Sequence, residues 1–114
     1  MRSLGDKGEG LAGAFLEKKG YRLLARNWRG PSGEVDLIAR DGEVVVFVEV
    51  KTRRARRFGD ALEAVDTRKQ EKIRQTALSY LSRLRPEPPV RFDVVTVFLE
   101  RDGSPRVEHL PGAF

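Results

Sequence analysis

Apolar residues in the middle of the chain form two short stretches separated by a turn signal. Leu37–Ala39 lies in the first stretch, and Val44–Val48 is an unbroken apolar run in the second. Unbroken runs of this length are typical of strands that are buried on both faces. The Asp41-Gly42 dipeptide between the stretches is typical of a hairpin turn. The pattern therefore predicts two paired strands within residues 33–51.

The periodicity of the apolar residues also predicts the remaining elements. In chain order we expect a helix over 6–19, a strand over 21–28, the two strands above, a helix that begins at 66–67 and ends before Pro86, a strand over 92–99 and a short strand over 107–110. This order predicts an α/β domain with a mixed sheet of four to five strands flanked by helices.

Four charged residues interrupt the two central strands. Because strand side chains alternate between faces, Glu34 shares a face with Asp36, and Glu49 shares a face with Lys51. Burying an unpaired carboxylate costs several kcal/mol or shifts its pKa until it is neutral. A compensating group is therefore expected beside these side chains.

Two registers of the hairpin are compatible with the pattern. A two-residue turn at Asp41-Gly42 places Glu34 opposite Glu49, whereas a turn one residue later places Asp36 opposite Glu49. Either register gathers the four charged groups on one side of the sheet, with the carboxylates within reach of a single cation. The pattern does not choose between the two registers.

Three carboxylates and an ammonium on one sheet face suit the hydrolysis of phosphodiesters with a divalent metal. Mg²⁺ is usually held by one or two carboxylates, with water and phosphate oxygens completing the octahedron. A lysine beside the ion orients or deprotonates the attacking water and stabilises charge on the phosphate. The alternative is a structural ion pair between Glu49 and Lys51, and the spacing alone does not decide between the two.

Composition limits the class of protein. The 114 residues correspond to one domain, residues 1–114, and the absence of cysteine excludes disulfides and thiolate metal sites. The start of the chain is too polar for a signal peptide, and no apolar stretch reaches the ~18–20 residues that span a bilayer. We therefore expect a cytoplasmic protein without a membrane partner. The 22 basic and 17 acidic residues give a net charge of +5, which modestly favours nucleic acid as the partner.

Several motifs in the chain together resemble a known family. They are Gly33–Ala39, Phe47–Arg53, Phe58-Gly59 and Arg91–Val95. In this order they are similar to the motifs of the YraN family of small bacterial proteins, and the likeness extends from about Gly5 to Phe98. Asp36 followed by Glu49-Val50-Lys51 also resembles the PD-(D/E)XK nuclease core, although Val35 stands where that name has a proline.

The resemblance implies a restriction-endonuclease-like fold whose core is similar to that of the archaeal Holliday-junction resolvases. It implies that Asp36 and Glu49 hold Mg²⁺ or Mn²⁺ and that the Val50 carbonyl is a third protein ligand. Lys51 then aligns and activates the attacking water.

Glu9 and Glu34 are further candidates for the metal or its outer shell. The resolvases have a glutamate in the first helix, and Gly8-Glu9 fits that setting loosely. For Glu9 the alternative is a capping box with Asp6, three residues earlier, at the start of the first helix.

Basic residues directly follow the Glu-x-Lys motif. They are Arg53, Arg54, Arg56 and Arg57. Arginine forks match phosphate oxygens, so we expect these residues to grip a nucleic-acid backbone rather than form a solvated loop. Lys69, in the first turn of the second helix, is a further candidate for nucleic-acid contact, and the alternative is a cation that faces solvent.

Two other polar residues have structural interpretations. Asp93 interrupts an apolar strand, and a partner such as Arg91 is expected there rather than catalysis. His109 has no nucleophile or ligand nearby in the sequence and is expected at the surface.

The hypothesis that combines these features is a metal-dependent endonuclease acting on structured or branched DNA. A homodimer is compatible with it, because a two-fold junction suits a two-fold protein. One alternative is a non-catalytic nucleic-acid-binding module that retains the nuclease fold. Another is a protein-interaction domain whose charges form surface ion pairs of about 0–1 kcal/mol each.

Overall fold

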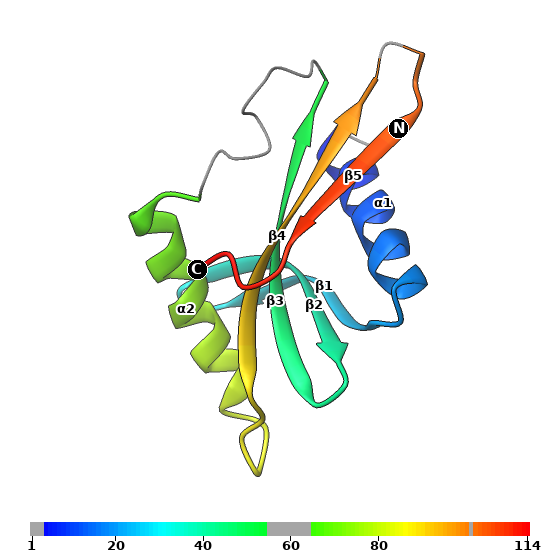
Figure 1. Ribbon diagram of the computed structural model, residues 1–114. Helices are drawn as coiled ribbons and strands as arrows, with labels where there is room; N and C mark the ends of the chain where they lie inside the picture. Colours follow the sequence, from blue (N-terminus) through cyan, green and yellow to red (C-terminus); the bar gives the residue numbers. More distant parts are fainter. Residues whose placement is uncertain (1–3, 55–64, 101) are drawn as a thin grey trace.

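The structure is a computed structural model that describes residues 4–54, 65–100 and 102–114. The described residues form two helices on opposite sides of a five-stranded sheet (Figure 1). The helices are α1 (Leu4–Lys18) and α2 (Thr67–Leu81), and the strands are β1 (Arg22–Gly30), β2 (Gly33–Asp41), β3 (Val44–Arg53), β4 (Val90–Leu99) and β5 (Pro105–Leu110). The predicted α/β fold with a mixed sheet flanked by helices is confirmed.

The strands lie side by side in chain order, with β3 at the centre. Strands β3 and β4 are parallel, and the other three neighbouring pairs are antiparallel. A parallel pair needs a crossover connection, and α2 lies between β3 and β4 in the chain. Strand β3 pairs with β2 over Val44–Val48 but with β4 as far as Arg53. The two neighbours of β3 therefore separate beyond Val48, and this is where the charged residues begin.

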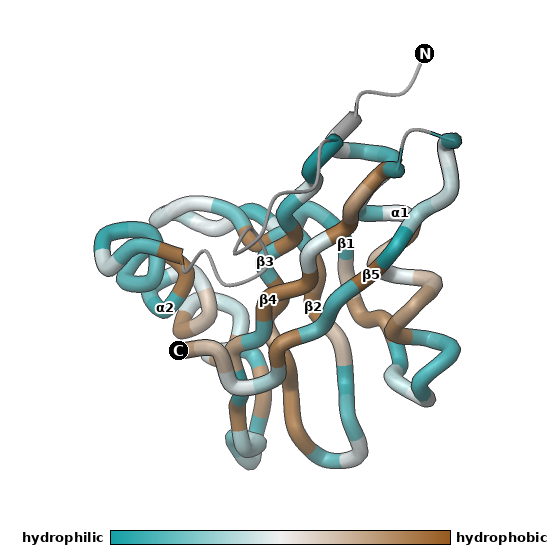
Figure 2. The backbone as a smooth tube through the Cα atoms, turned by 45° about the horizontal axis from the view of Figure 1, so that its top comes forward, coloured by the Kyte–Doolittle hydropathy of each residue, from teal (hydrophilic) through white to brown (hydrophobic). Residues whose placement is uncertain are grey.

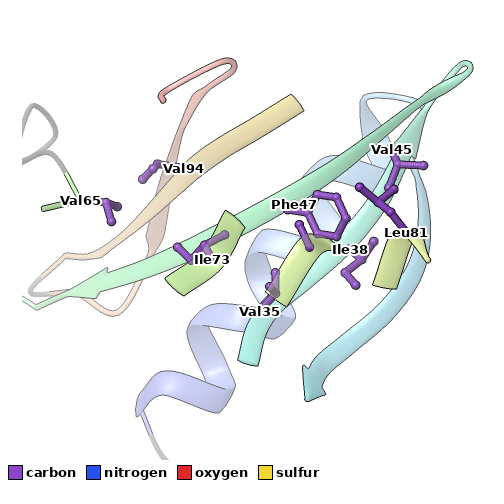
Figure 3. Close-up of a cluster of buried hydrophobic side chains, with 9 residues drawn as sticks. Val35, Ile38, Val45, Phe47, Val65, Ile73, Leu81 and Val94 are labelled. Atoms are coloured by element: carbon purple, nitrogen blue, oxygen red, sulfur yellow. The ribbon is translucent and has the colours of Figure 1, made fainter. Parts of the chain in front are cut away.

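Each face of the sheet carries a hydrophobic cluster. Phe47 belongs to the cluster on the α2 side together with Ile73 (Figure 3). Val46 and Val48 belong to the cluster on the α1 side together with Leu16. Burial of a large apolar side chain contributes roughly 1.5–3 kcal/mol. The apolar run of β3 is unbroken because both of its faces are covered, and the hydrophobic segments follow the central strands in Figure 2.

The register of the central hairpin is the second of the two alternatives. Leu37 pairs with Val48 and Asp41 pairs with Val44, so the turn is at Gly42-Glu43. Gly42 has a φ of +61°, a left-handed conformation that glycine adopts without steric cost. Continued by one residue, this register places Asp36 opposite Glu49.

The helix boundaries differ from those predicted. Helix α1 is already helical at Leu4, so Asp6 lies in its first turn and the predicted capping box of Asp6 with Glu9 is wrong. Helix α2 has Asp66 as its N-cap and ends at Leu81, several residues before Pro86. No helix in the part of the chain that the structure describes is both long and apolar enough to cross a membrane.

Asp93 lies in the interior of β4 and is the centre of a polar network. Its carboxylate accepts two hydrogen bonds from Arg91 and one from the Gly112 N–H, each 2.9 Å long. His109 Nε2 lies 2.7 Å from the same carboxylate, and the His109 side chain is 2% exposed. Burial alone raises the pKa of Asp93, but the hydrogen bonds from His109 and Arg91 lower it to about 2. The expected Arg91 partner is confirmed, whereas the prediction that His109 lies at the surface is wrong.

Candidate metal and nucleic-acid site

Asp36 and Glu49 meet where strands β2 and β3 separate. The Val50 N–H donates a 2.8 Å hydrogen bond to Asp36 Oδ2, so this side chain continues the contact between the strands beyond the last backbone pair. Glu49 lies two residues after Phe47 on β3 and is buried. Strand alternation places it on the face of Phe47, toward α2. The hairpin register thus brings together the two carboxylates that the sequence separates by 13 positions.

The two carboxylates repel each other. Burial and the nearby charge of Glu49 raise the pKa of Asp36 from 3.8 to about 6, against the lowering effects of the Val50 N–H and Lys69. A side-chain hydrogen bond between Asp36 and Glu49 adds to the rise, because it favours a shared proton. A cation beside the pair would relieve this repulsion.

Lys69 supplies such a charge from the first turn of α2. Its Nζ lies 2.5 Å from Glu49 Oε1, and the hydrogen bond to Glu49 raises the pKa of Lys69. The N-cap Asp66 accepts a 2.9 Å hydrogen bond from the Lys69 N–H, which fixes the start of the helix. Lys69 is thus exposed, as the alternative expects, but its ammonium group also pairs with a buried carboxylate.

Lys51 lies on the same face of β3 as Glu49, two residues further along the strand. A hollow of about 290 Å³ opens between the end of β3 and the start of α2. The residues that line it are Glu49, Val50, Lys51, Thr52, Arg53, Val65, Asp66 and Lys69. The hollow is thus lined by Lys69 and by four predicted site residues of β3, namely Glu49, Val50, Lys51 and Arg53. Asp36 lies beside the hollow and contacts Glu49.

Glu9 approaches the pair from α1. Burial and the nearby charge of Asp36 raise the pKa of Glu9, while a hydrogen bond from Asn27 lowers it. Glu9 Oε1 is buried without a hydrogen-bond partner, and Arg26 Nη2 lies 3.7 Å away from it. Asn27 has a φ of +48°, an uncommon left-handed conformation for a strand residue. No sequence signal pointed to Arg26 or Asn27, which reach the site only through the pairing of β1 with β2.

Gly8 permits this approach of α1. A Cβ atom built on Gly8 would lie 1.9 Å from Thr52 Oγ1 on β3, closer than two such atoms can come. The glycine that weakens the helix in isolation therefore lets α1 contact β3 directly beside Glu9. In the sequence, Gly8 was notable only for its place beside Glu9, and no pattern there indicated its contact with Thr52.

Glu34 does not join the other carboxylates. Its Oε2 accepts a 3.0 Å hydrogen bond from Arg29 at the exposed turn between β1 and β2. The reason is a break in strand alternation, because Val35 and Ile38 are three residues apart yet belong to the same cluster on the α2 side. Within the described residues, no three Asp, Glu, His or Cys side chains are spaced to hold one metal ion. The expectation of three carboxylates around one cation is therefore wrong.

The remaining residues still fit a hard divalent cation. Mg²⁺ needs only one or two protein carboxylates, because water and phosphate oxygens supply the other ligands. Asp36 and Glu49 provide that number, and the backbone of Val50 lies beside both. The orphaned buried oxygen of Glu9 is suited to accept a hydrogen bond from a water of such an ion.

The arginines that follow β3 are only partly described. Arg53 is half-buried at the end of the strand, and its Nη1 donates a 3.2 Å hydrogen bond to the Thr52 carbonyl. Arg54 is exposed immediately beyond the strand. Arg56 and Arg57 lie outside the described residues, as do Phe58 and Gly59 of the third motif.

Comparison with known proteins identifies the family. The chain is 53% identical over 114 residues to a UPF0102 protein of Symbiobacterium thermophilum, covering 99% of this chain and 97% of the relative. It is 48% identical over 113 residues to a UPF0102 protein of a Parafrankia species, covering 97% of this chain and 95% of the relative. It is 44% identical over 114 residues to one of Geobacter metallireducens, covering 99% and 93%. The model of the uncharacterised protein family UPF0102 matches residues 8–97. The chain therefore belongs to the UPF0102 family, which is the YraN-like family that its motifs resemble.

Proposed function

We propose that this protein hydrolyses phosphodiester bonds of structured or branched DNA with the help of a divalent metal ion. The observation that carries the proposal is the pair of opposed carboxylates, Asp36 and Glu49, at a point where two strands separate beside a basic hollow. Burial and the charge of Glu49 raise the pKa of Asp36, and shifts of this kind cluster at functional sites. The resemblance to the PD-(D/E)XK core and to the archaeal resolvases supports the same reaction.

Each residue of the site has a distinct role in the proposal. Asp36, Glu49 and the Val50 carbonyl hold Mg²⁺ or Mn²⁺, which when bound polarises the phosphate and lowers the pKa of a ligand water. Lys51, on the same face as Glu49, orients the attacking water and offers a proton donor at the phosphate. Glu9 accepts a hydrogen bond from a water in the outer shell.

Nucleic acid is held through its backbone in this proposal. Arg53 and Arg54, together with Arg56 and Arg57, follow the site directly, and their guanidinium groups match phosphate oxygens. Such contacts carry no base information, so recognition depends on the shape of the DNA. A homodimer would present two sites to a two-fold junction. Sedimentation of the protein–junction complex tests this, because two copies per junction support the dimer and one copy contradicts it.

A gel assay tests the proposed reaction. Labelled four-way junction, flap, duplex and single-stranded DNA are each incubated with and without Mg²⁺ or Mn²⁺. Metal-dependent cleavage of the branched substrates is expected, and Asp36→Asn and Lys51→Met should abolish it while keeping most of the DNA affinity. If both variants cut as well as the parent chain, the assignment is wrong.

The second candidate function is a non-catalytic nucleic-acid-binding module. The observation that favours it is the ion pair of Lys69 with Glu49, which neutralises a carboxylate without any metal. This function predicts DNA binding that weakens steeply with salt and no cleavage products with any metal. The same gel assay separates the two functions.

A further inference from the structure

Lys69 places a positive charge directly at the carboxylate pair. Its ammonium nitrogen lies 2.5 Å from Glu49 Oε1, and the Glu49 side chain is only 7% exposed. The charge of Lys69 also acts on Asp36, whose pKa it lowers. One ammonium group therefore compensates both carboxylates, from the side on which the hollow opens.

The backbone of Lys69 is fixed, whereas most of its side chain is open to solvent. The N-cap Asp66 holds the Lys69 N–H at 2.9 Å, and the Gln70 side chain donates a 2.7 Å hydrogen bond to the Val65 carbonyl. The Lys69 side chain is nevertheless 56% exposed. A lysine carries its charge on a flexible four-carbon stem. The ammonium can thus leave Glu49 without any shift of α2.

We propose that Lys69 is the internal counter-ion of the metal-free site and competes with the divalent cation for Glu49. This inference rests on the proposed function, because it concerns the same carboxylates. An ammonium group and a divalent cation cannot both contact the exposed side of one carboxylate oxygen. Binding of a cation to Glu49 Oε1 therefore requires Lys69 to leave that oxygen, and the energy of this ion pair opposes such binding.

Displacement gives Lys69 a second role. The released ammonium stays at the hollow that Lys51 and Arg53 also line. A phosphate of the nucleic acid is the anion that it meets there, which adds one cation to the backbone contacts. Lys69 thereby couples the two ligands: the metal-free protein pairs this charge internally, and the metal-loaded protein presents it to DNA.

Calorimetric titration with Mn²⁺, in the absence of nucleic acid, tests the competition. The variants are Lys69→Gln, Asp36→Asn and the matched control Lys72→Gln, which removes an exposed lysine one turn further along α2. Lys69→Gln should bind Mn²⁺ on the order of tenfold more tightly than the parent chain, because the competing ion pair is gone. Lys72→Gln should change the affinity by less than about twofold, because its charge is screened by solvent. Asp36→Asn should not bind.

The outcomes separate this inference from the proposed function. The competition is supported if Lys69→Gln binds Mn²⁺ more tightly than the parent chain and Lys72→Gln does not. It is also supported if Lys69→Gln binds Mn²⁺ and the parent chain does not. Unchanged or weaker binding by Lys69→Gln, with a parent chain that binds and an Asp36→Asn variant that does not, overturns the competition and leaves the metal site in place. Equal tightening by Lys72→Gln also overturns it. Absence of binding in both the parent chain and Lys69→Gln overturns the competition and the metal site together.

Discussion

Replacement of Asp36 by asparagine should stabilise the metal-free protein at neutral and alkaline pH. The asparagine side chain keeps an oxygen that can accept the Val50 N–H hydrogen bond, but it removes the charge that Glu49 repels. The pKa of Asp36 rises from 3.8 to about 6 on folding. A rise of about two pKa units corresponds to ~3 kcal/mol of lost stability. Part of this cost belongs to the interaction of Asp36 with Glu49 and is divided between the two residues. We therefore expect the free energy of unfolding of the variant to rise by about 1–3 kcal/mol.

The pH dependence of this gain has a definite sign. Well below pH 3.8 Asp36 is protonated in both the folded and the unfolded chain, so its ionisation does not affect stability. Between pH 4 and 6 the unfolded chain loses the proton first, and the parent protein loses stability as the pH rises. Above pH 6 the folded carboxylate is ionised as well, and the penalty is constant. The advantage of Asp36→Asn should therefore be small near pH 4 and complete at pH 8.

Urea denaturation in EDTA at pH 4 and pH 8 measures the effect. Glu43→Gln is the matched control, because Glu43 is an exposed carboxylate in the same hairpin, and this change should alter stability by less than ~0.5 kcal/mol at either pH. An Asp36→Asn variant that is less stable than the parent chain at both pH values would refute the reasoning. In that case the hydrogen bond to Val50 outweighs the repulsion between the carboxylates.

Two further changes test the close contact of α1 with β3 and the polar network of Asp93. Gly8→Ala should destabilise the fold by roughly 1–3 kcal/mol and weaken Mn²⁺ binding, because its Cβ meets Thr52 Oγ1 at 1.9 Å. The control Gly10→Ala meets nothing within 4 Å and should stabilise α1 by up to ~1 kcal/mol in thermal melts; equal melting temperatures of the two variants would contradict the close contact. Asp93→Asn should cost about 3–5 kcal/mol in urea denaturation at pH 7, because Arg91 loses its buried partner. The contribution of Asp93 is present above pH 4 and is lost as the pH falls through about 2, so a cost that persists unchanged at pH 2 would argue against the charged pair.

The sheet and its helices could be predicted because their patterns are local. The apolar run Val44–Val48 indicates a strand whose two faces are both buried. Apolar residues at helical spacing, among them Ile73 and Ala77, indicate the buried face of α2. The register could only be narrowed to two alternatives, because a shift of the turn by one residue leaves the strand pattern acceptable. In the structure the turn is at Gly42-Glu43, where Gly42 has a left-handed backbone conformation. This register places Asp36 opposite Glu49.

The errors at the site have a common cause in tertiary structure. Regular alternation predicted Glu34 beside Asp36, but the packing of both Val35 and Ile38 toward α2 interrupts that alternation. The ion pair of Lys69 with Glu49 depends on where α2 packs against the sheet, and no spacing in the sequence encodes it. His109 was misplaced for the same reason, because its partner Asp93 lies on the neighbouring strand.

The proposed function requires that Asp36 and Glu49 form a metal-dependent hydrolytic site from which Glu34 is excluded. Single-turnover cleavage of a labelled four-way junction in Mn²⁺ tests it most directly, with the parent chain compared with Asp36→Asn, Glu49→Gln and Glu34→Gln. We predict that the first two variants lose at least ~100-fold in rate, the range typical of lost electrostatic groups, while Glu34→Gln stays within about twofold. Cleavage that survives in Asp36→Asn or Glu49→Gln, or that is lost equally in Glu34→Gln, would contradict the account.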